Sequence, residues 1–235
     1  MTTSMRPSLH IVTNEGGVAA SHPLREKVRG MAAVGQIVIL NGVSRAGKST
    51  LARAVQEGVP GLWMHIGMDA HKGCTPPALQ PGVGLRPGVT QIKPEIEAYV
   101  PILFAGLYET VAAHARLGLD VVMDVNHHES YSRPYGILRA CARQLLGLPV
   151  LFVAVRCPVD VIWERRAATW GQLRGAVAED VVAAVELGQT ATHAHGHYDL
   201  EVDTSVVSPA EGARMIGRRL ADGPPGTAFV IHAGR

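Results

Sequence analysis

A glycine-rich segment near residue 45 has the residue types and spacing that hold the phosphates of a nucleotide. Residues 42–49 fit the pattern G-x-x-x-x-G-K-[ST] at every required position. Glycine at both fixed positions lets successive backbone N–H groups approach phosphate oxygens at a helix N-terminus. Lys48 would place a positive charge on the β- and γ-phosphates, and Ser49 a hydroxyl on Mg²⁺. The predicted nucleotide-binding residues are Gly42, Val43, Ser44, Arg45, Ala46, Gly47, Lys48, Ser49 and Thr50.

The flanks of this motif have the pattern that a phosphate-binding loop requires. The apolar run 36–41 before it is typical of a buried strand, and Leu51, Ala52, Ala54 and Val55 continue as a helix. A chance match is the alternative in a chain with 26 glycines. The strand, loop and helix order favours the functional interpretation.

Two carboxylates follow predicted strands at the positions where ligands of open α/β sheets bind. Asp69 comes after the run 63–66, and Asp124 closes the run Val121-Val122-Met123. Asp69 could accept the proton of an attacking hydroxyl, or only cap the next turn. Asp124 could hold Mg²⁺, contact the substrate, or be a structural residue of the strand end.

Short apolar runs alternate with longer helical patterns, which predicts an α/β fold with a parallel sheet flanked by helices. Five strands are expected at 37–40, 63–66, 121–125, 150–155 and 199–202. Helices are expected near 49–56, 95–117, 135–146, 159–168, 179–190 and 209–220, the last with Ser208 as N-cap and Glu211 three residues later.

The predicted organisation is one domain with two short extensions. Residues 1–34 lack sustained periodicity and are expected to be a dispensable, flexible N-terminal extension; 35–222 form the P-loop domain and 223–235 a C-terminal tail. The stretches 73–94 and 169–176 resist assignment, and long irregular segments in an enzyme are often lids or substrate loops.

Composition and charge exclude several classes of protein. The chain has 22 basic and 20 acidic residues without a basic block, which disfavours a nucleic-acid binder. Three widely spaced cysteines without a CxxC pair indicate reduced thiols, and no signal peptide or membrane span is evident, so we expect a cytoplasmic protein. Its expected partner is a small-molecule hydroxyl acceptor, without nucleic acid or membrane; self-assembly stays open.

A phosphate-binding loop does not by itself specify a reaction, since GTPases and motor ATPases share it. Neither a D-x-x-G nor an N-K-x-D guanine-recognition segment is found, and 235 residues leave little room for motor machinery. The sequence therefore favours a kinase that uses ATP and Mg²⁺, with Ser49 and Asp124 as candidate metal ligands.

Several segments in order resemble the chloramphenicol phosphotransferase family. They are Ile39-Leu40-Asn41-Gly42, Ile66-Gly67-Met68-Asp69, Val155-Arg156-Cys157 and residues 198–204, within a resemblance over about 36–221. The resemblance implies a P-loop NTPase sheet like that of nucleoside monophosphate kinases. It also implies a cytosolic, ATP-dependent enzyme that phosphorylates, and so inactivates, an antibiotic, with Asp69 as catalytic base.

The resemblance also points to arginines of a lid that screens the transferring phosphoryl group. Arg165 matches a family arginine in position, whereas Arg174 aligns less directly because 169–173 replaces a shorter stretch. Either arginine could instead be a solvated helix charge.

The sequence leaves open what its clustered histidines do and which molecule accepts the phosphoryl group. His193, His195 and His197 could place imidazoles on one strand face as in some zinc sites, but no further ligands complete a shell. Four further histidines lie beside Asp69 or Asp124 and could shape an acceptor pocket or be surface or turn residues: His65, His71, His127 and His128. The alternatives to an antibiotic kinase are a kinase of an ordinary metabolite or nucleoside and a non-catalytic ATP-binding module.

Overall fold

The computed structural model describes residues 34–87 and 94–234, so nearly all of the predicted extension 1–34 lies outside the described residues. The strands are β1 (Ile37–Asn41), β2 (Trp63–Gly67), β3 (Asp120–Val125), β4 (Val150–Arg156) and β5 (Leu200–Asp203). All neighbouring strands are parallel, in the order β2-β3-β1-β4-β5. Each predicted strand is confirmed within one residue at either end.

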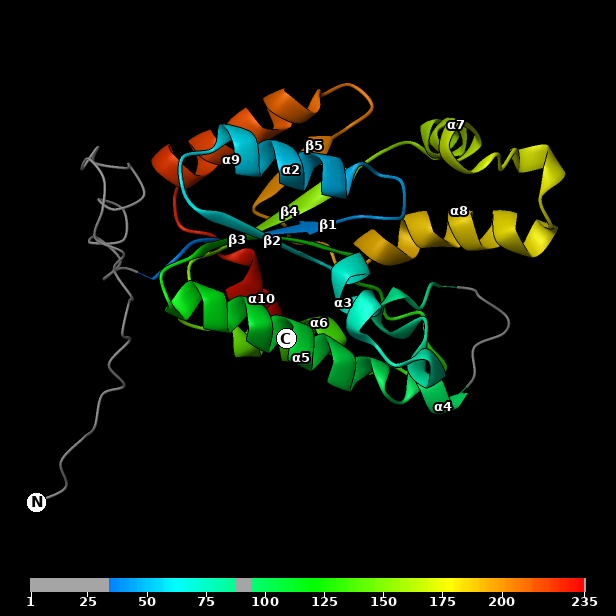
Figure 1. The fold of residues 1–235 in the computed structure, drawn as a ribbon, viewed down its shortest axis with the longest axis horizontal. Coiled ribbons are helices and arrows are strands. Elements are labelled where there is room, and N and C mark those ends of the chain that lie inside the picture. Colours follow the sequence, from blue (N-terminus) through cyan, green and yellow to red (C-terminus); the bar gives the residue numbers. More distant parts are fainter. Residues whose placement is uncertain (1–33, 88–93, 235) are drawn as a thin grey trace, which may run out of the picture. The chain divides into compact units, whose positions relative to one another are not determined.

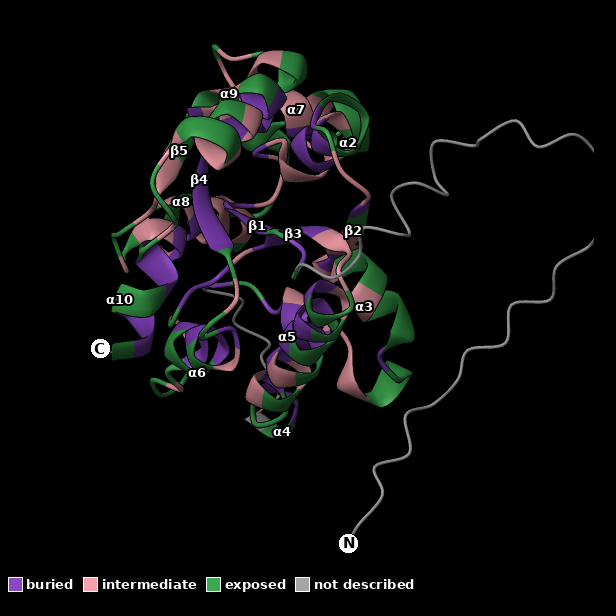
Figure 2. Cartoon of the chain, turned by 90° about the vertical axis from the view of Figure 1, so that its left-hand side faces the viewer, coloured by how far each residue is buried: buried purple, intermediate pink, exposed green. Residues whose placement is uncertain are grey.

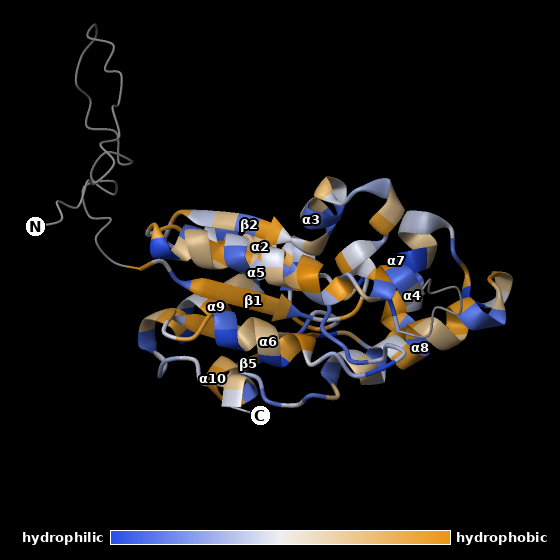
Figure 3. Cartoon of the chain, turned by 90° about the horizontal axis from the view of Figure 1, so that it is seen from below, coloured by the Kyte–Doolittle hydropathy of each residue, from blue (hydrophilic) through white to orange (hydrophobic). Residues whose placement is uncertain are grey.

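The central strand β1 divides the core into two halves. All five of its residues are buried, and it is deep orange on the hydropathy scale (Figure 3). Because successive strand side chains point to opposite faces, Ile37 and Ile39 join one apolar cluster and Val38 and Leu40 join the other. The sheet is therefore covered by helices on both faces, as parallel sheets require.

On one face α2 and α9 lie side by side, and α5, α6 and α10 cover the other (Figure 1). The helix bounds are α2 (Lys48–Gly58), α3 (Met68–Cys74), α4 (Pro94–Glu97), α5 (Val100–Arg116), α6 (Ile137–Gln144), α7 (Val159–Trp170), α8 (Glu179–His193), α9 (Pro209–Asp222) and α10 (Ala228–Gly234). Most of these helices are purple toward the sheet and green outward (Figure 2). The six predicted helices are confirmed, with the second divided into α4 and α5.

The start of α9 confirms the predicted cap. The Ser208 hydroxyl oxygen accepts a hydrogen bond from the backbone N–H of Glu211 at 3.2 Å. The Glu211 side chain instead pairs with Arg214 and Arg218. Only half of a capping box is therefore present: the Ser208 side chain accepts from an N–H of the first turn that has no partner within the helix.

The helix α10 was not predicted, because its seven residues were placed in the C-terminal tail. Ala228, Phe229 and Ala233 are buried, and the Phe229 ring lies 4.9 Å from that of Phe152 on β4. Burying a phenylalanine side chain contributes about 1.5–3 kcal/mol. Residues 228–234 therefore complete the core below the sheet.

The stretch Glu95–Arg116 is long and apolar enough to cross a membrane by length and composition alone. In this structure Phe104, Leu107 and Tyr108 of α5 are buried in the core cluster on one face of the sheet. Its hydropathy is that of a core helix.

The segments that resisted assignment gather beyond the carboxyl ends of the strands (Figure 1). The segment after α3 contains the short 3₁₀ helices η1 (Pro77–Leu79) and η2 (Gly82–Gly84). The turn between α7 and α8 contains η3 (Arg174–Ala176). These segments and the loop after β1 surround the candidate site.

Candidate active site

The phosphate-binding loop has the backbone geometry that the sequence predicts. Gly47 precedes α2 with φ 87° and ψ 11°, in the left-handed region that favours glycine. Arg45 also has a positive φ, 69°. At Gly42, a Cβ atom would lie 2.5 Å from the carbonyl oxygen of Val155. The loop therefore ends on the N-terminus of α2, where backbone N–H groups lack intrahelical partners.

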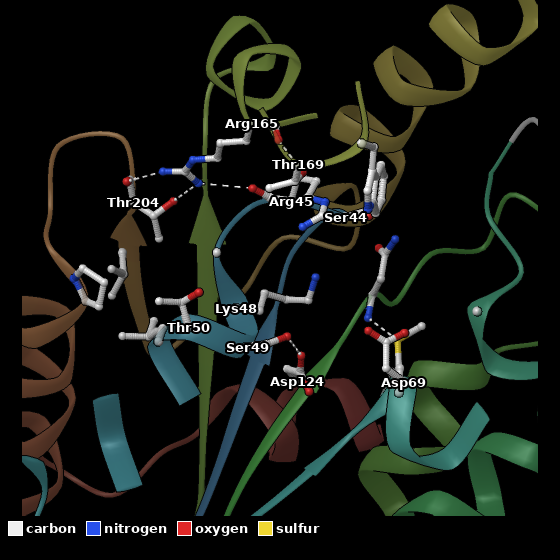
Figure 4. Close-up of a pocket in the computed structure, with 18 of the residues that line it drawn as sticks. Ser44, Arg45, Lys48, Ser49, Thr50, Asp69, Asp124, Arg165, Thr169 and Thr204 are labelled. Atoms are coloured by element: carbon white, nitrogen blue, oxygen red, sulfur yellow. Dashed lines mark hydrogen bonds between the residues drawn. The ribbon is translucent and has the colours of Figure 1, made fainter. Parts of the chain in front are cut away.

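Lys48 lies at the centre of the cavity (Figure 4), where its Nζ atom donates a hydrogen bond to the carbonyl oxygen of Val43 at 2.8 Å. Burial lowers the pKa of Lys48 to about 8, although the charges of Asp124 and Asp69 oppose this shift. An amine held in this way can move a short distance toward a phosphate oxygen, where its charged form is favoured.

Ser49 and Asp124 are brought together, as the metal prediction requires. The Ser49 hydroxyl donates to Asp124 Oδ2 at 2.6 Å, and His65 Nε2 lies 3.1 Å from Asp124 Oδ1. Burial raises the pKa of Asp124, but hydrogen bonds from His65 and Ser49 and the charge of Lys48 outweigh it, so the pKa lies below its usual value. Asp124 therefore remains a carboxylate.

Gly67, the last residue of β2, makes room for this carboxylate. A Cβ atom at Gly67 would lie 1.8 Å from Asp124 Oδ1. Hydroxyl and carboxylate oxygens are the donors that Mg²⁺ prefers, and Ser49 and Asp124 supply one of each. The residues present therefore fit a magnesium ion shared with nucleotide phosphates.

Asp69 lies in the first turn of α3, directly after β2, and lines the same cavity as Lys48. In the close-up it lies on one side of Lys48 and Ser49, while Arg165 and Thr204 lie on the other (Figure 4). The structure thus brings the predicted base and the phosphate-binding loop to one space.

Arg165 of α7 connects three segments of the cavity wall. Its guanidinium donates to the carbonyl oxygen of Arg45 at 3.2 Å, the hydroxyl of Thr204 at 3.0 Å and the carbonyl oxygen of Thr204 at 2.7 Å. It therefore joins the phosphate-binding loop to the segment after β5. Arg165 lines the cavity, where the sequence analysis places it.

Arg174 lies outside the site in this structure, contrary to its placement among the catalytic candidates. It pairs with Asp160 at 3.4 Å and with Glu186, and its side chain is about half exposed. It is absent from the cavity lining. The physical reason is local: acidic side chains on α7 and α8 neutralise it at the surface.

Three cavity residues were not predicted as a group: Arg45, Arg86 and Trp170. Arg45 lies in the predicted loop, but its guanidinium carbon lies 3.6 Å from the centre of the Trp170 ring. The guanidinium of Arg86, after η2, lies 6.0 Å from the same ring. The three residues lie far apart in the chain, so no local sequence pattern indicates that they meet.

The histidine clusters have structural partners. His193 Nδ1 lies 2.7 Å from the Tyr198 hydroxyl, which also lies 3.1 Å from His195 Nε2. Burial lowers the pKa of both His193 and His195 to about 4. In the described part of the chain no group of three or more His, Cys, Asp or Glu side chains could hold a metal ion.

The cavity has a volume of about 530 Å³, which suits a nucleotide and a small second substrate. Among the described residues, five cationic side chains line it against two acidic ones. The cations are Arg45, Lys48, Lys72, Arg86 and Arg165, and the acids are Asp69 and Asp124.

Comparison with known proteins relates this chain to phosphotransferases. A family model described as chloramphenicol phosphotransferase-like protein matches residues 35–221. A curated Mycobacterium tuberculosis protein, provisionally named an O-phosphotransferase, is 25% identical over 201 residues, covering 82% of this chain and 86% of that protein.

Solved structures of a kinase and of an antibiotic-resistance protein share the fold. The Mycobacterium tuberculosis APS kinase CysC in complex with AMPPNP and APS has a TM-score of 0.53 at 16% identity, over 81% of this chain and 99% of that one. The Deinococcus radiodurans tunicamycin resistance protein has a TM-score of 0.51 at 19% identity, over 82% and 98%. At these identities the likeness shows the P-loop kinase fold alone.

Proposed function

The chain belongs to the chloramphenicol phosphotransferase-like family, and from that membership we propose that it is an ATP-dependent O-phosphotransferase. It would move the γ-phosphoryl group of ATP to a hydroxyl of a small molecule. ATP is available in the cytoplasm, which is where we place the reaction.

One observation carries this proposal: Lys48, the Ser49–Asp124 pair and Asp69 all open into the same cavity. A protein that only binds nucleotide needs Lys48, Ser49 and Asp124. It has no use for a second carboxylate, Asp69, across from the phosphates. A kinase needs one there, to orient the acceptor hydroxyl or accept its proton.

The roles of the side chains follow from their positions. Lys48 would leave the carbonyl oxygen of Val43 and bind β- and γ-phosphate oxygens. Ser49 and Asp124 would hold Mg²⁺, which neutralises charge on the phosphates when bound. Asp69 would orient the acceptor hydroxyl for in-line attack and take its proton.

Support for ATP as the donor comes from the other end of the cavity. Val202, Val207 and Pro209 line it beside Thr204 and the guanidinium of Arg165. Apolar side chains with a few placed polar groups are the usual environment of a nucleotide base. We assign this end to adenine and the Asp69 end to the acceptor.

The family description makes an antibiotic hydroxyl, such as that of chloramphenicol, the first candidate acceptor, with resistance by inactivation as the outcome. The excess of cationic over acidic lining residues favours a second candidate, an ordinary metabolite with an anionic group. Both candidates use the same catalytic residues.

An acceptor panel tests the proposal. The full chain is incubated with Mg-ATP and chloramphenicol, nucleosides, sugars or hydroxy acids, and ADP release and phosphorylated product are measured, with Lys48→Ala as the inactive reference. We expect ADP release that depends on one acceptor class. Tight ATP binding without transfer to any compound would instead favour the non-catalytic module.

A further inference from the structure

Three arginines from three different segments surround the ring of Trp170. The guanidinium carbons of Arg45, Arg166 and Arg86 lie 3.6, 5.0 and 6.0 Å from its centre. A cation over an indole ring gains about 0.5–2 kcal/mol, which offsets only part of the repulsion between three like charges. We call Arg45, Arg86 and Arg166 the arginine cluster.

The described residues offer the cluster no acidic partner. Within residues 34–87 and 94–234, no carboxylate lies at ion-pair distance from any of its three members. The gap at 88–93, which follows Arg86 closely, contains no Asp or Glu in the sequence. By contrast, Arg174, on the lid that α7 and the turn before α8 form, has two carboxylate partners.

Arg166 makes this lack of a counter-charge costly. It is only 3% exposed; among the described residues its one side-chain hydrogen bond goes to the neutral Gln172, and its Nε finds no partner there. The Nε of Arg45 is also buried without a partner. A buried charge without compensation is strongly destabilising, so a charge that the described residues leave uncompensated points to an anion that completes the cluster.

Arg86 is held at the cluster from the acceptor side. The buried His128 donates from Nε2 to the carbonyl oxygen of Leu85 at 2.9 Å, and its ring lies 4.4 Å from that of Tyr131. Burial lowers the pKa of His128, so the ring is neutral and Nε2 carries the proton toward this carbonyl. The backbone next to Arg86 is therefore fixed.

The nucleotide already has its own cations, since Lys48 lies in the phosphate-binding loop and Arg165 is bonded to that loop. The Arg45 guanidinium turns from the loop toward the lid, where it stacks on Trp170. Arg86 comes from the segment that follows Asp69 and α3. Arg45 and Arg86 line the cavity, and Arg166 adjoins it through the ring of Trp170, which lines it too.

We propose that the arginine cluster binds an anionic group of the acceptor, so that the substrate is a hydroxyl compound bearing a carboxylate or phosphate. Planar guanidinium groups bind both anions through paired hydrogen bonds. This inference rests on the proposed function, because it assigns the cluster to the acceptor of that reaction. It disfavours a neutral acceptor such as chloramphenicol.

Sulfate titration of the full chain saturated with Mg-AMPPNP tests the subsite directly, at constant ionic strength set with chloride. AMPPNP fills the phosphate-binding loop, so sulfate that still binds must occupy another site. We expect saturable binding by calorimetry, weakened about tenfold in Arg86→Gln and Arg166→Gln. Arg116→Gln, an exposed arginine at the end of α5, is the matched control and should bind sulfate normally.

Sulfate that competes with AMPPNP would assign the cluster to the nucleotide and overturn the proposal, as would sulfate binding unchanged in both variants. Arg86 is exposed, so its variant decides the matter if Arg166→Gln does not fold. Carboxylate and phosphate acceptors are distinguished with pantothenol and pantothenate, and with glycerol and glycerol 3-phosphate.

Among compounds that are phosphorylated, each anionic member should exceed its neutral partner in kcat/KM, and the advantage should shrink in Arg86→Gln. Equal rates for neutral and anionic members would overturn the inference while leaving the phosphotransferase intact. If nothing is phosphorylated but sulfate binds as expected, the proposed function fails and the anion site stands.

Discussion

The two ends of the cavity treat charge in opposite ways. At the strand ends, Asp124 is hydrogen-bonded to Ser49 and His65, and its charge is offset by Lys48 nearby. Around Trp170, Arg45, Arg86 and Arg166 gather without a carboxylate from the described residues. The difference indicates that protein groups balance the charge of Asp124, whereas the arginines need an anionic ligand.

The strand end is also the more rigid of the two. Asp124 and Gly67 pair in register between β3 and β2, so the carboxylate is fixed by two strands. The arginines around Trp170 instead come from a loop, a segment after a 3₁₀ turn and the end of α7, which open at lower free energy than core strands. Preorganised groups suit the step of phosphoryl transfer, and movable groups suit binding and release.

The largest expected effect is at Asp69, on the side of the cavity that we assign to the acceptor. We expect Asp69→Asn to lower transfer about 10²- to 10⁴-fold while ATP affinity stays near normal, because the amide keeps the shape but cannot take the proton. Turnover at saturating acceptor and ATP titration measure the two quantities. A collapse of ATP affinity would make Asp69 a metal or nucleotide residue.

Raising the pH should weaken nucleotide binding, because it deprotonates Lys48. Its pKa of about 8 means that the free enzyme loses this proton as the pH rises through 8, whereas phosphates bind the protonated form. AMPPNP affinity should therefore fall above pH 8, by at most about tenfold per pH unit. Lys48→Arg keeps its charge in this range and should remove the dependence; an equal dependence in that variant would point to another group.

The regular part of the molecule was predictable from sequence because its signals are local. The run Ile37 to Leu40 shows a buried strand, and the G-x-x-x-x-G-K-S pattern shows the turn and helix that follow. Asp69 and Asp124 could be placed because parallel strands end at one edge of a sheet. Their shared cavity is the outcome expected from that rule.

The lid was not predictable in the same way, because its contacts join residues far apart in the chain. Nothing near Arg45 indicates that it stacks on Trp170, 125 positions later, or that Arg86 lies by the same ring. α10 was missed because Ala228–Gly234 is short and follows a glycine- and proline-rich segment. Only tertiary packing determines these elements.

A moderate effect is expected at Arg165, which belongs to the nucleotide end although it lies on the lid helix. Arg165→Gln loses charge-assisted hydrogen bonds to the Arg45 and Thr204 carbonyl oxygens. We expect ATP affinity to weaken about tenfold, with the KM for the acceptor unchanged. The reverse result, a change in acceptor KM alone, would mean that Arg165 binds the acceptor together with the arginine cluster. The nucleotide and acceptor would then share their cationic residues.

The smallest effect is expected at Arg174, which is the test of whether this lid geometry is the one used in catalysis. Exposed ion pairs contribute little, typically 0.2–1 kcal/mol, and Arg174 is paired with Asp160 and Glu186 away from the cavity. Arg174→Gln should therefore change kcat and both KM values by less than about twofold. A fall in kcat of tenfold or more would mean that the lid closes further and that Arg174 exchanges its carboxylate partners for a phosphate. In that event the double variant Asp160→Asn/Glu186→Gln, which frees the guanidinium, should raise kcat, whereas under the present geometry it should leave kcat unchanged.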